Sequence, residues 1–170
     1  MATEPEPLDS AKLAEPSRSF LTLLARRLPD FARHARMELR SGSEGHDLLV
    51  ELTSPTGDPK RDLVLWMENG DEPSVGFGEW HTHDWYPRGA GPSATAEAMI
   101  DLIELILADR IVLLQNVGGE HDGSIDFLDL RDPEALADEL TAPWSPGRAR
   151  ILTWSGRGDR EVSLGDLKIG

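Results

Sequence analysis

The sequence predicts an α+β fold with a mainly antiparallel sheet, and three observations support this. Three strand-like runs separated by short turns lie between residues 47 and 83, which is typical of an antiparallel meander. An apolar helical pattern covers residues 93–109, and further strand-like runs follow it. We expect a flexible, proline-rich tail at residues 1–16 and one domain over residues 17–170.

The predicted elements begin with an N-terminal helix. Ser17 or Ser19 can cap this helix, and Pro29 interrupts it before a second helical piece that ends near Met37. The central helix at 93–109 is apolar around most of its circumference, so we expect it to be buried against the sheet. The predicted strands lie near residues 47–53, 62–68, 74–83, 111–117, 124–130 and 150–164, with a hairpin at Asn69-Gly70, a short helix at 132–140 and a turn at 155–159.

Charge narrows the classes of function. The net charge is −14, from 31 acids and 17 bases, which repels phosphate backbones and disfavours nucleic-acid binding. The same charge favours association with a basic protein partner. We find neither a secretory signal nor an apolar run long enough to span a bilayer, so we expect a cytoplasmic protein without membrane contacts.

The segment from Glu79 to Trp85 holds two of the five histidines and two of the five tryptophans. On one continuous strand, His81 and His83 would share a face and lie about 6.7 Å apart, so both could bind one metal ion. Glu79 would lie about 13 Å from His83 on the same face, which is too far for easy participation. The chain has no cysteine, so a third ligand would be a histidine or a carboxylate from elsewhere in the chain, with Asp84, Glu97, Asp101, Glu51 and His121 as candidates.

The order His81-Thr82-His83, a loop with Pro87 and Pro92, and then Ser93-Ala-Thr-Ala96 resembles the JAMM (MPN-type) metallopeptidases. The resemblance covers about residues 38–105. It implies a zinc hydrolase in which His81 and His83 bind zinc and an upstream glutamate, Glu38 by spacing, acts as the base. Ala96 stands where the family has its aspartate ligand, and the interval from His83 to Ser93 is two residues longer than in the family.

A second resemblance is to small acidic bacterial proteins of the immunity type. It rests on Gly57-Asp58-Pro59, on the Phe-x-x-Trp-His-Thr-His strand at 77–83, and on Trp154 to Asp159. It implies a non-catalytic protein that binds a partner, such as an inhibitor of a basic toxin.

Two functional hypotheses follow, together with a plainer role for the histidines. The leading one is a non-catalytic partner-binding protein without a cofactor, with Trp80, Asp84 and Trp85 as candidate contacts. The alternative is a zinc hydrolase in which Glu38 or Glu79 is the base. In the plainest reading, His81 and His83 only hydrogen-bond neighbouring backbone at a strand end.

Overall fold

A computed structural model describes residues 8–42, 45–68, 72–82, 91–132, 134–143, 145–163 and 165. It has an α+β fold with two antiparallel sheets, which confirms the predicted fold class. The helices are η1 (Ser10–Lys12), α1 (Glu15–Arg27), α2 (Pro29–His34), η2 (Pro59–Arg61), α3 (Pro92–Leu107) and α4 (Ala135–Thr141). The strands are β1 (Arg36–Gly42), β2 (Gly45–Leu52), β3 (Leu63–Glu68), β4 (Glu72–Phe77), β5 (Trp80–Thr82), β6 (Ile111–Asn116), β7 (Ile125–Asp129), β8 (Arg148–Leu152) and β9 (Arg160–Ser163).

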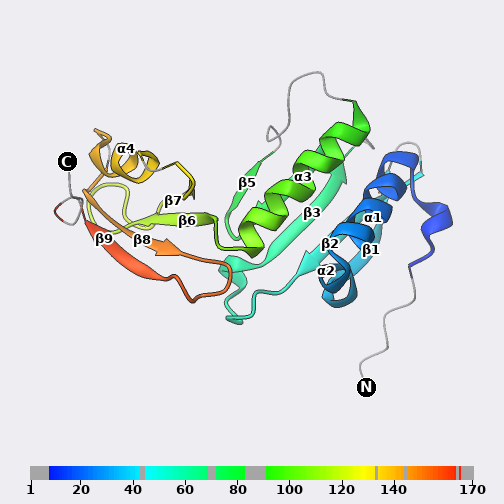
Figure 1. Cartoon of the computed structure of the whole chain (residues 1–170), viewed down its shortest axis with the longest axis horizontal. Coiled ribbons are helices and arrows are strands. Elements are labelled where there is room, and N and C mark those ends of the chain that lie inside the picture. The colour runs from blue at the N-terminus through cyan, green and yellow to red at the C-terminus, as the bar shows by residue number, and fades with distance from the viewer. Residues whose placement is uncertain are drawn as a thin grey trace. The chain divides into compact units, whose positions relative to one another are not determined.

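The chain divides into two compact units made of interleaved segments (Figure 1). Unit 1 contains residues 1–52, 63–76 and 81–101, and unit 2 contains residues 53–62, 77–80 and 102–170. The chain therefore passes from one unit to the other after residues 52, 62, 76, 80 and 101. A single domain over residues 17–170 stays a prediction. None of the described helices is long and apolar enough to cross a membrane.

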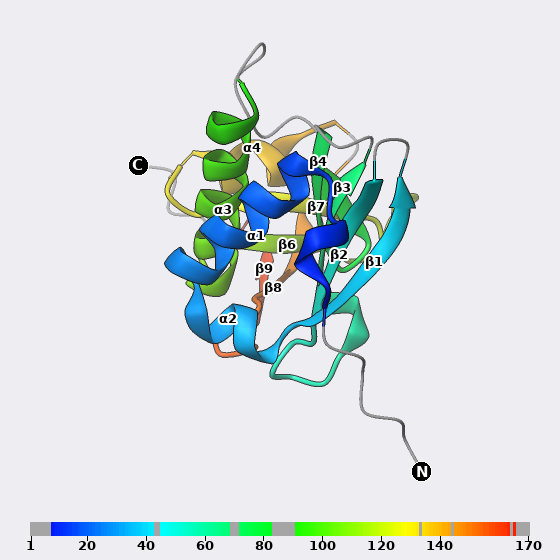
Figure 2. The ribbon, with the colours of Figure 1, turned by 90° about the vertical axis from the view of Figure 1, so that its right-hand side faces the viewer.

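Unit 1 is built on the five-stranded sheet in the order β1-β2-β3-β4-β5. Along β2, Leu48 and Val50 are buried, and in β3 Leu63 and Leu65 are buried, whereas the residues between them are less so. This alternation places one face of the sheet in a core. Helix α1 packs on β2, and Figure 2 shows α1 and α2 on the same side of the sheet. Arg27 of α1 forms an ion pair of 2.7 Å with Asp101 of α3.

Unit 2 is built on the four-stranded sheet in the order β7-β6-β8-β9, in which β6 pairs with both β7 and β8. Helix α4 covers one face of this sheet, as Figure 1 shows. There Leu140 of α4 belongs to a buried cluster with Val112, Leu114, Leu128 and Ile151. The second half of α3 contributes side chains that are almost completely buried, as the apolar pattern predicts.

Two sequence predictions need correction at the N-terminal end. The predicted tail extends too far, because residues 10–12 form η1, Leu13 is buried beside His46, and α1 begins at Glu15. Residues 1–7 lie outside the described part of the chain. The second correction concerns β1, where we expected the end of a helix. The chain leaves α2 at His34 and pairs with β2 from residue 36 onward.

Candidate functional site

The predicted strand at residues 74–83 is interrupted at Gly78, and this changes the geometry of the predicted histidine site. Strand β4 ends at Phe77 and β5 begins at Trp80, with a turn at residues 78–79. Gly78 has a φ of +62°, and a Cβ there would lie 1.9 Å from the carbonyl oxygen of Lys60. A two-residue connection joins antiparallel neighbours. Glu79 therefore lies in a turn, and it is not on a strand face shared with His81.

The structure places only part of the predicted metal site. His81 lies in β5 and is exposed. His83, Asp84 and Trp85 lie outside the described residues. Within the described ranges, no three histidine or carboxylate side chains are grouped so that they could hold a metal ion. The zinc site stays a prediction.

The candidate third ligands are dispersed. Asp101 binds Arg27, and Glu51 forms an ion pair of 3.6 Å with Arg36. His121 lies exposed in the connection between β6 and β7, and Glu97 lies exposed on α3.

The two candidate bases are also placed by the structure. Glu38 lies on β1, where its carboxylate pairs with Arg36 and, at 3.0 Å, with Arg40. Strands β1 and β5 are at opposite edges of the sheet, and four strand spacings separate them by about 19 Å. The structure therefore does not bring Glu38 to His81. Glu79 forms an exposed ion pair of 3.7 Å with Lys60.

Trp80, a predicted partner contact, packs against another aromatic residue of unit 2. Its ring lies 4.5 Å from the ring of Phe127 in β7, measured between centroids, and the planes are tilted by 40°. Both side chains are partly exposed. Tryptophan is enriched at the centre of protein interfaces, and the role of Trp80 as a partner contact stays a prediction.

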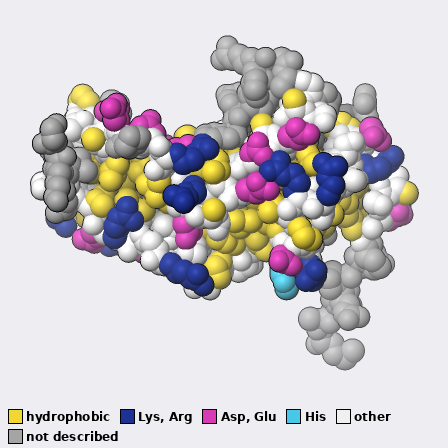
Figure 3. Space-filling model, viewed as in Figure 1, with side chains coloured by type: hydrophobic (Ala, Val, Ile, Leu, Met, Phe, Trp, Pro, Cys, Tyr) yellow, Lys and Arg dark blue, Asp and Glu magenta, His cyan; other side chains and the backbone are white. Residues whose placement is uncertain are grey.

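Phe127 belongs to a stretch that holds half of the net charge of the chain. Residues 111–147, here called the acidic segment, contain eight acids and one base, which gives a net charge of −7. Six of these acids are exposed, and Asp129 and Glu139 are partly buried. The single base, Arg131, is bound by Asp129, with Nε 2.9 Å from the carboxylate. In Figure 3, acidic side chains lie over α4, at the upper left of the view. The eight acids are Glu120, Asp122, Asp126, Asp129, Asp132, Glu134, Asp138 and Glu139.

Burial and the neighbouring carboxylates together affect the pKa of one acid of the segment, Glu139. Burial, and then the charges of Asp126 and Asp138, raise the pKa of the Glu139 carboxyl above its ordinary value. No described residue forms an ion pair with any of these three acids. Asp126, Asp138 and Glu139 therefore have no cation at ion-pair distance within the described part of unit 2.

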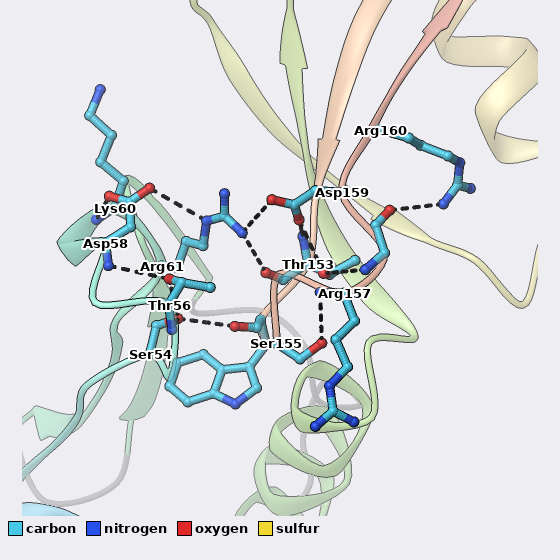
Figure 4. A network of polar contacts seen from close by, with 12 residues as sticks. Ser54, Thr56, Asp58, Lys60, Arg61, Thr153, Ser155, Arg157, Asp159 and Arg160 are labelled. Atoms are coloured by element: carbon cyan, nitrogen blue, oxygen red, sulfur yellow. Dashed lines mark hydrogen bonds and ion pairs between the residues drawn. The ribbon is translucent and has the colours of Figure 1, made fainter.

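A buried arginine holds together two loops of unit 2 (Figure 4). The side chain of Arg61 is only 11% exposed. Its Nη1 lies 2.7 Å from Asp159 and donates to the carbonyl oxygen of Thr153 at 3.2 Å, and its Nε lies 3.4 Å from Asp58. The buried hydroxyl of Ser54 donates to the carbonyl oxygen of Trp154 at 3.0 Å. These contacts fix the segment at residues 53–62 against residues 153–159.

The carboxylate of Asp159 is the central acceptor of this network. It accepts hydrogen bonds from the backbone and hydroxyl of Thr153 at 2.9 and 3.2 Å. Burial alone would raise the pKa of Asp159, but the hydrogen bonds from Thr153 and Arg61 outweigh it and lower that pKa. Gly156 allows the close approach of the two loops, because its φ is +73° and a Cβ there would lie 2.7 Å from Thr56 Cγ2. We assign the network a structural role.

Sequence reasoning named His81 and Trp80 as candidates but overlooked the acidic segment. The signal was present, because a running count of charge along the chain falls steeply between residues 120 and 139. The total charge alone hides this distribution. The two loops of the Arg61 network include Gly57-Asp58-Pro59 and Trp154 to Asp159, which were noted for the second resemblance. Their contact was not predicted, because the loops are about 90 residues apart in the sequence.

The first prediction concerns metal. We expect purified protein to hold no stoichiometric zinc by elemental analysis, because no three histidine or carboxylate side chains are grouped within the described ranges. Thermal stability in chelator should equal that in buffer. Stoichiometric zinc that disappears in a His81→Ala, His83→Ala double variant would instead support the hydrolase.

The second prediction concerns pH. The folded state holds the Glu139 proton more tightly than the unfolded state, so this group lowers stability as pH rises through the window just above its ordinary pKa of 4.5. Glu139→Gln should therefore give a small rise in Tm at pH 7 and none at pH 3. Glu97→Gln, which removes an exposed carboxylate outside the acidic segment, is the matched control and should change Tm less. Equal effects of both variants at pH 7 would contradict the prediction.

The third prediction concerns the buried arginine. Arg61→Met keeps the aliphatic stem but leaves the Asp58 and Asp159 carboxylates without their cation, which should cost about 3 kcal/mol in urea unfolding. Arg131→Met removes a guanidinium from an exposed pair and should cost less than about 1 kcal/mol. Similar costs for the two variants would argue against a central role of Arg61.

No protein-family model, curated protein or solved structure matches this chain. The two resemblances stated above stay predictions, and the function has to be inferred from the residues and their placement.

Proposed function

We propose that this chain is a non-catalytic protein-binding protein whose acidic segment binds a basic partner, as an immunity-type inhibitor of a basic toxin would. The observation that carries the proposal is the uncompensated charge of residues 111–147, a net −7 with one base already bound to Asp129. Self-repulsion of this kind weakens a fold. A cationic partner that relieves the repulsion therefore gains binding free energy from it.

The raised pKa of Glu139 supports this interpretation. A carboxyl whose pKa is raised by burial and by neighbouring carboxylates is destabilised in its charged form. An arginine or lysine of a partner placed beside Asp126 and Asp138 would stabilise that charged form. Binding should then lower the pKa of Glu139 and release protons in weakly acidic buffer.

The aromatic pair of Trp80 and Phe127 adds an apolar contact near the charges. Protein interfaces combine an apolar, aromatic-rich centre with a charged rim that steers association. Phe127 and Asp126 are neighbours in β7, an edge strand of its sheet, and their side chains point to opposite faces. A partner that binds along this edge, and not only on one face, would meet both kinds of side chain.

The fourth prediction tests this function. The protein should bind small basic proteins of pI above about 9 and not acidic ones of equal size, when either set is immobilised on a biosensor. Affinity should fall steeply with added salt, because exposed charges are screened. Neutralising three exposed acids of the segment should lower the affinity at low salt by about tenfold or more and flatten its salt dependence. The variant carries Asp126→Asn, Glu134→Gln and Asp138→Asn.

A matched control neutralises three exposed acids of unit 1. This second variant carries Glu15→Gln, Asp30→Asn and Glu97→Gln, so its net charge changes by the same amount. It should keep most of the affinity. Equal losses in both variants would reduce the proposal to a general charge effect, and salt-independent binding would overturn it.

A further inference from the structure

Strand β1 forms an edge of the five-stranded sheet with an open side. It pairs with β2 along its whole length, from Arg36 opposite Glu51 to Gly42 opposite Gly45. In the described part of the chain no strand pairs with its other side, and Figure 2 shows β1 at the margin of the sheet. About half of the N–H and C=O groups of an edge strand point away from its neighbour. This edge is therefore a template for another strand.

The side chains of β1 divide cleanly between the two faces. Met37 and Leu39 lie opposite Val50 and Leu48, which are buried, so they belong to the helix-covered face. Both are themselves only partly buried. The opposite face carries a ladder in which a glutamate stands between two arginines, Arg36, Glu38 and Arg40. Glu38 pairs with both arginines within the chain.

We propose that β1 pairs with β1 of a second copy of this chain, antiparallel and centred on Leu39, which joins two five-stranded sheets into one continuous sheet. In this register Leu39 of one chain lies opposite Leu39 of the other, so the residue numbers of each cross-strand pair add up to 78. Glu38 then faces Arg40 of the second copy, and Arg40 faces Glu38. The remaining pairs are Arg36 with Gly42 and Met37 with Ser41, so all seven residues are paired.

Charge complementarity is what favours a second copy over another strand. Charged side chains and prolines usually protect an edge strand from pairing. The β1 ladder differs because it has both signs, and a register centred on Leu39 places opposite charges face to face while pairing the whole strand. Opposite charges directly across an antiparallel pair stabilise it, whereas like charges destabilise it. A register centred on Met37 would pair only the first half of β1 and would leave Arg40 without a partner.

The small size of the β1 interface determines the expected affinity of the dimer. An edge of seven residues buries less surface than a standard interface, so the dimer should be weak and should depend on concentration. The partly exposed side chains of Met37 and Leu39 add a small apolar contact on the helix-covered face. The twofold axis runs perpendicular to the sheet, which places the helices of both copies on one face. The inference is independent of the partner proposed above, because β1 lies in unit 1 and the acidic segment in unit 2.

Sedimentation equilibrium of the full chain between about 10 μM and 1 mM tests the proposal, because weak interfaces associate in that range. The protein should pass from monomer to dimer. Glu38→Arg places arginines opposite one another in both cross-strand pairs, and Arg40→Glu does the same with glutamates. Each single variant should weaken dimerisation by about tenfold or more. In the register centred on Met37, Arg40→Glu would have no effect, which would overturn the proposed register.

A charge-exchange experiment distinguishes the loss of the dimer contact from misfolding of a variant. An equimolar mixture of the Glu38→Arg and Arg40→Glu chains should form a heterodimer, and the double variant in one chain should regain the homodimer. Glu97→Arg and Arg26→Glu, which make the same charge changes at exposed positions of α3 and α1, should dimerise like the unchanged protein. A monomer at all concentrations, or a dimer that ignores the charge reversals, would overturn the proposal.

Discussion

The buried guanidinium of Arg61 is the constraint on which the order of unit 2 depends. A cation that is nearly removed from water needs anions and carbonyl oxygens around it, and Asp58, Asp159 and Thr153 supply them. The segment at residues 53–62 is thereby fixed, and with it the carbonyl oxygen of Lys60. That oxygen occupies the space that a Cβ at residue 78 would need, so only glycine fits in the turn there. The turn then directs Trp80 toward Phe127.

This dependence explains which parts of the fold the sequence could predict. Apolar periodicity placed the central helix within two residues of α3, and the alternating runs found the described strands of both sheets except β1. The break at Gly78 was missed because a lone glycine in an alternating run is compatible with both a strand and a turn. The contact that decides between them comes from Lys60, eighteen residues earlier. Strand β1 was missed because its charged residues, following two helices, do not look like a strand.

The candidate site also shows that contacts between distant parts of the chain could not be predicted from the sequence. Spacing along the chain can pair His81 with His83, but it carries no information on sheet order. Glu38 was selected as a base by its distance in the sequence, and the sheet order then placed β1 and β5 at opposite edges. The charge of residues 111–147 could have been predicted, since it is a property of composition along the chain and needs no contact.

Charge is used in two different ways in this protein. On β1, both signs alternate within one strand, and the chain pairs them internally, so the long-range field of the strand is small. Such a ladder acts only at contact distance, where the order of signs decides which strand fits. The acidic segment has almost no counter-charge of its own. Its electrostatic field is therefore limited mainly by screening, which acts over about 8 Å at physiological ionic strength. A field of that kind attracts any cationic surface and selects little, so the choice of partner has to come from shape and from neighbouring apolar contacts such as Trp80 and Phe127.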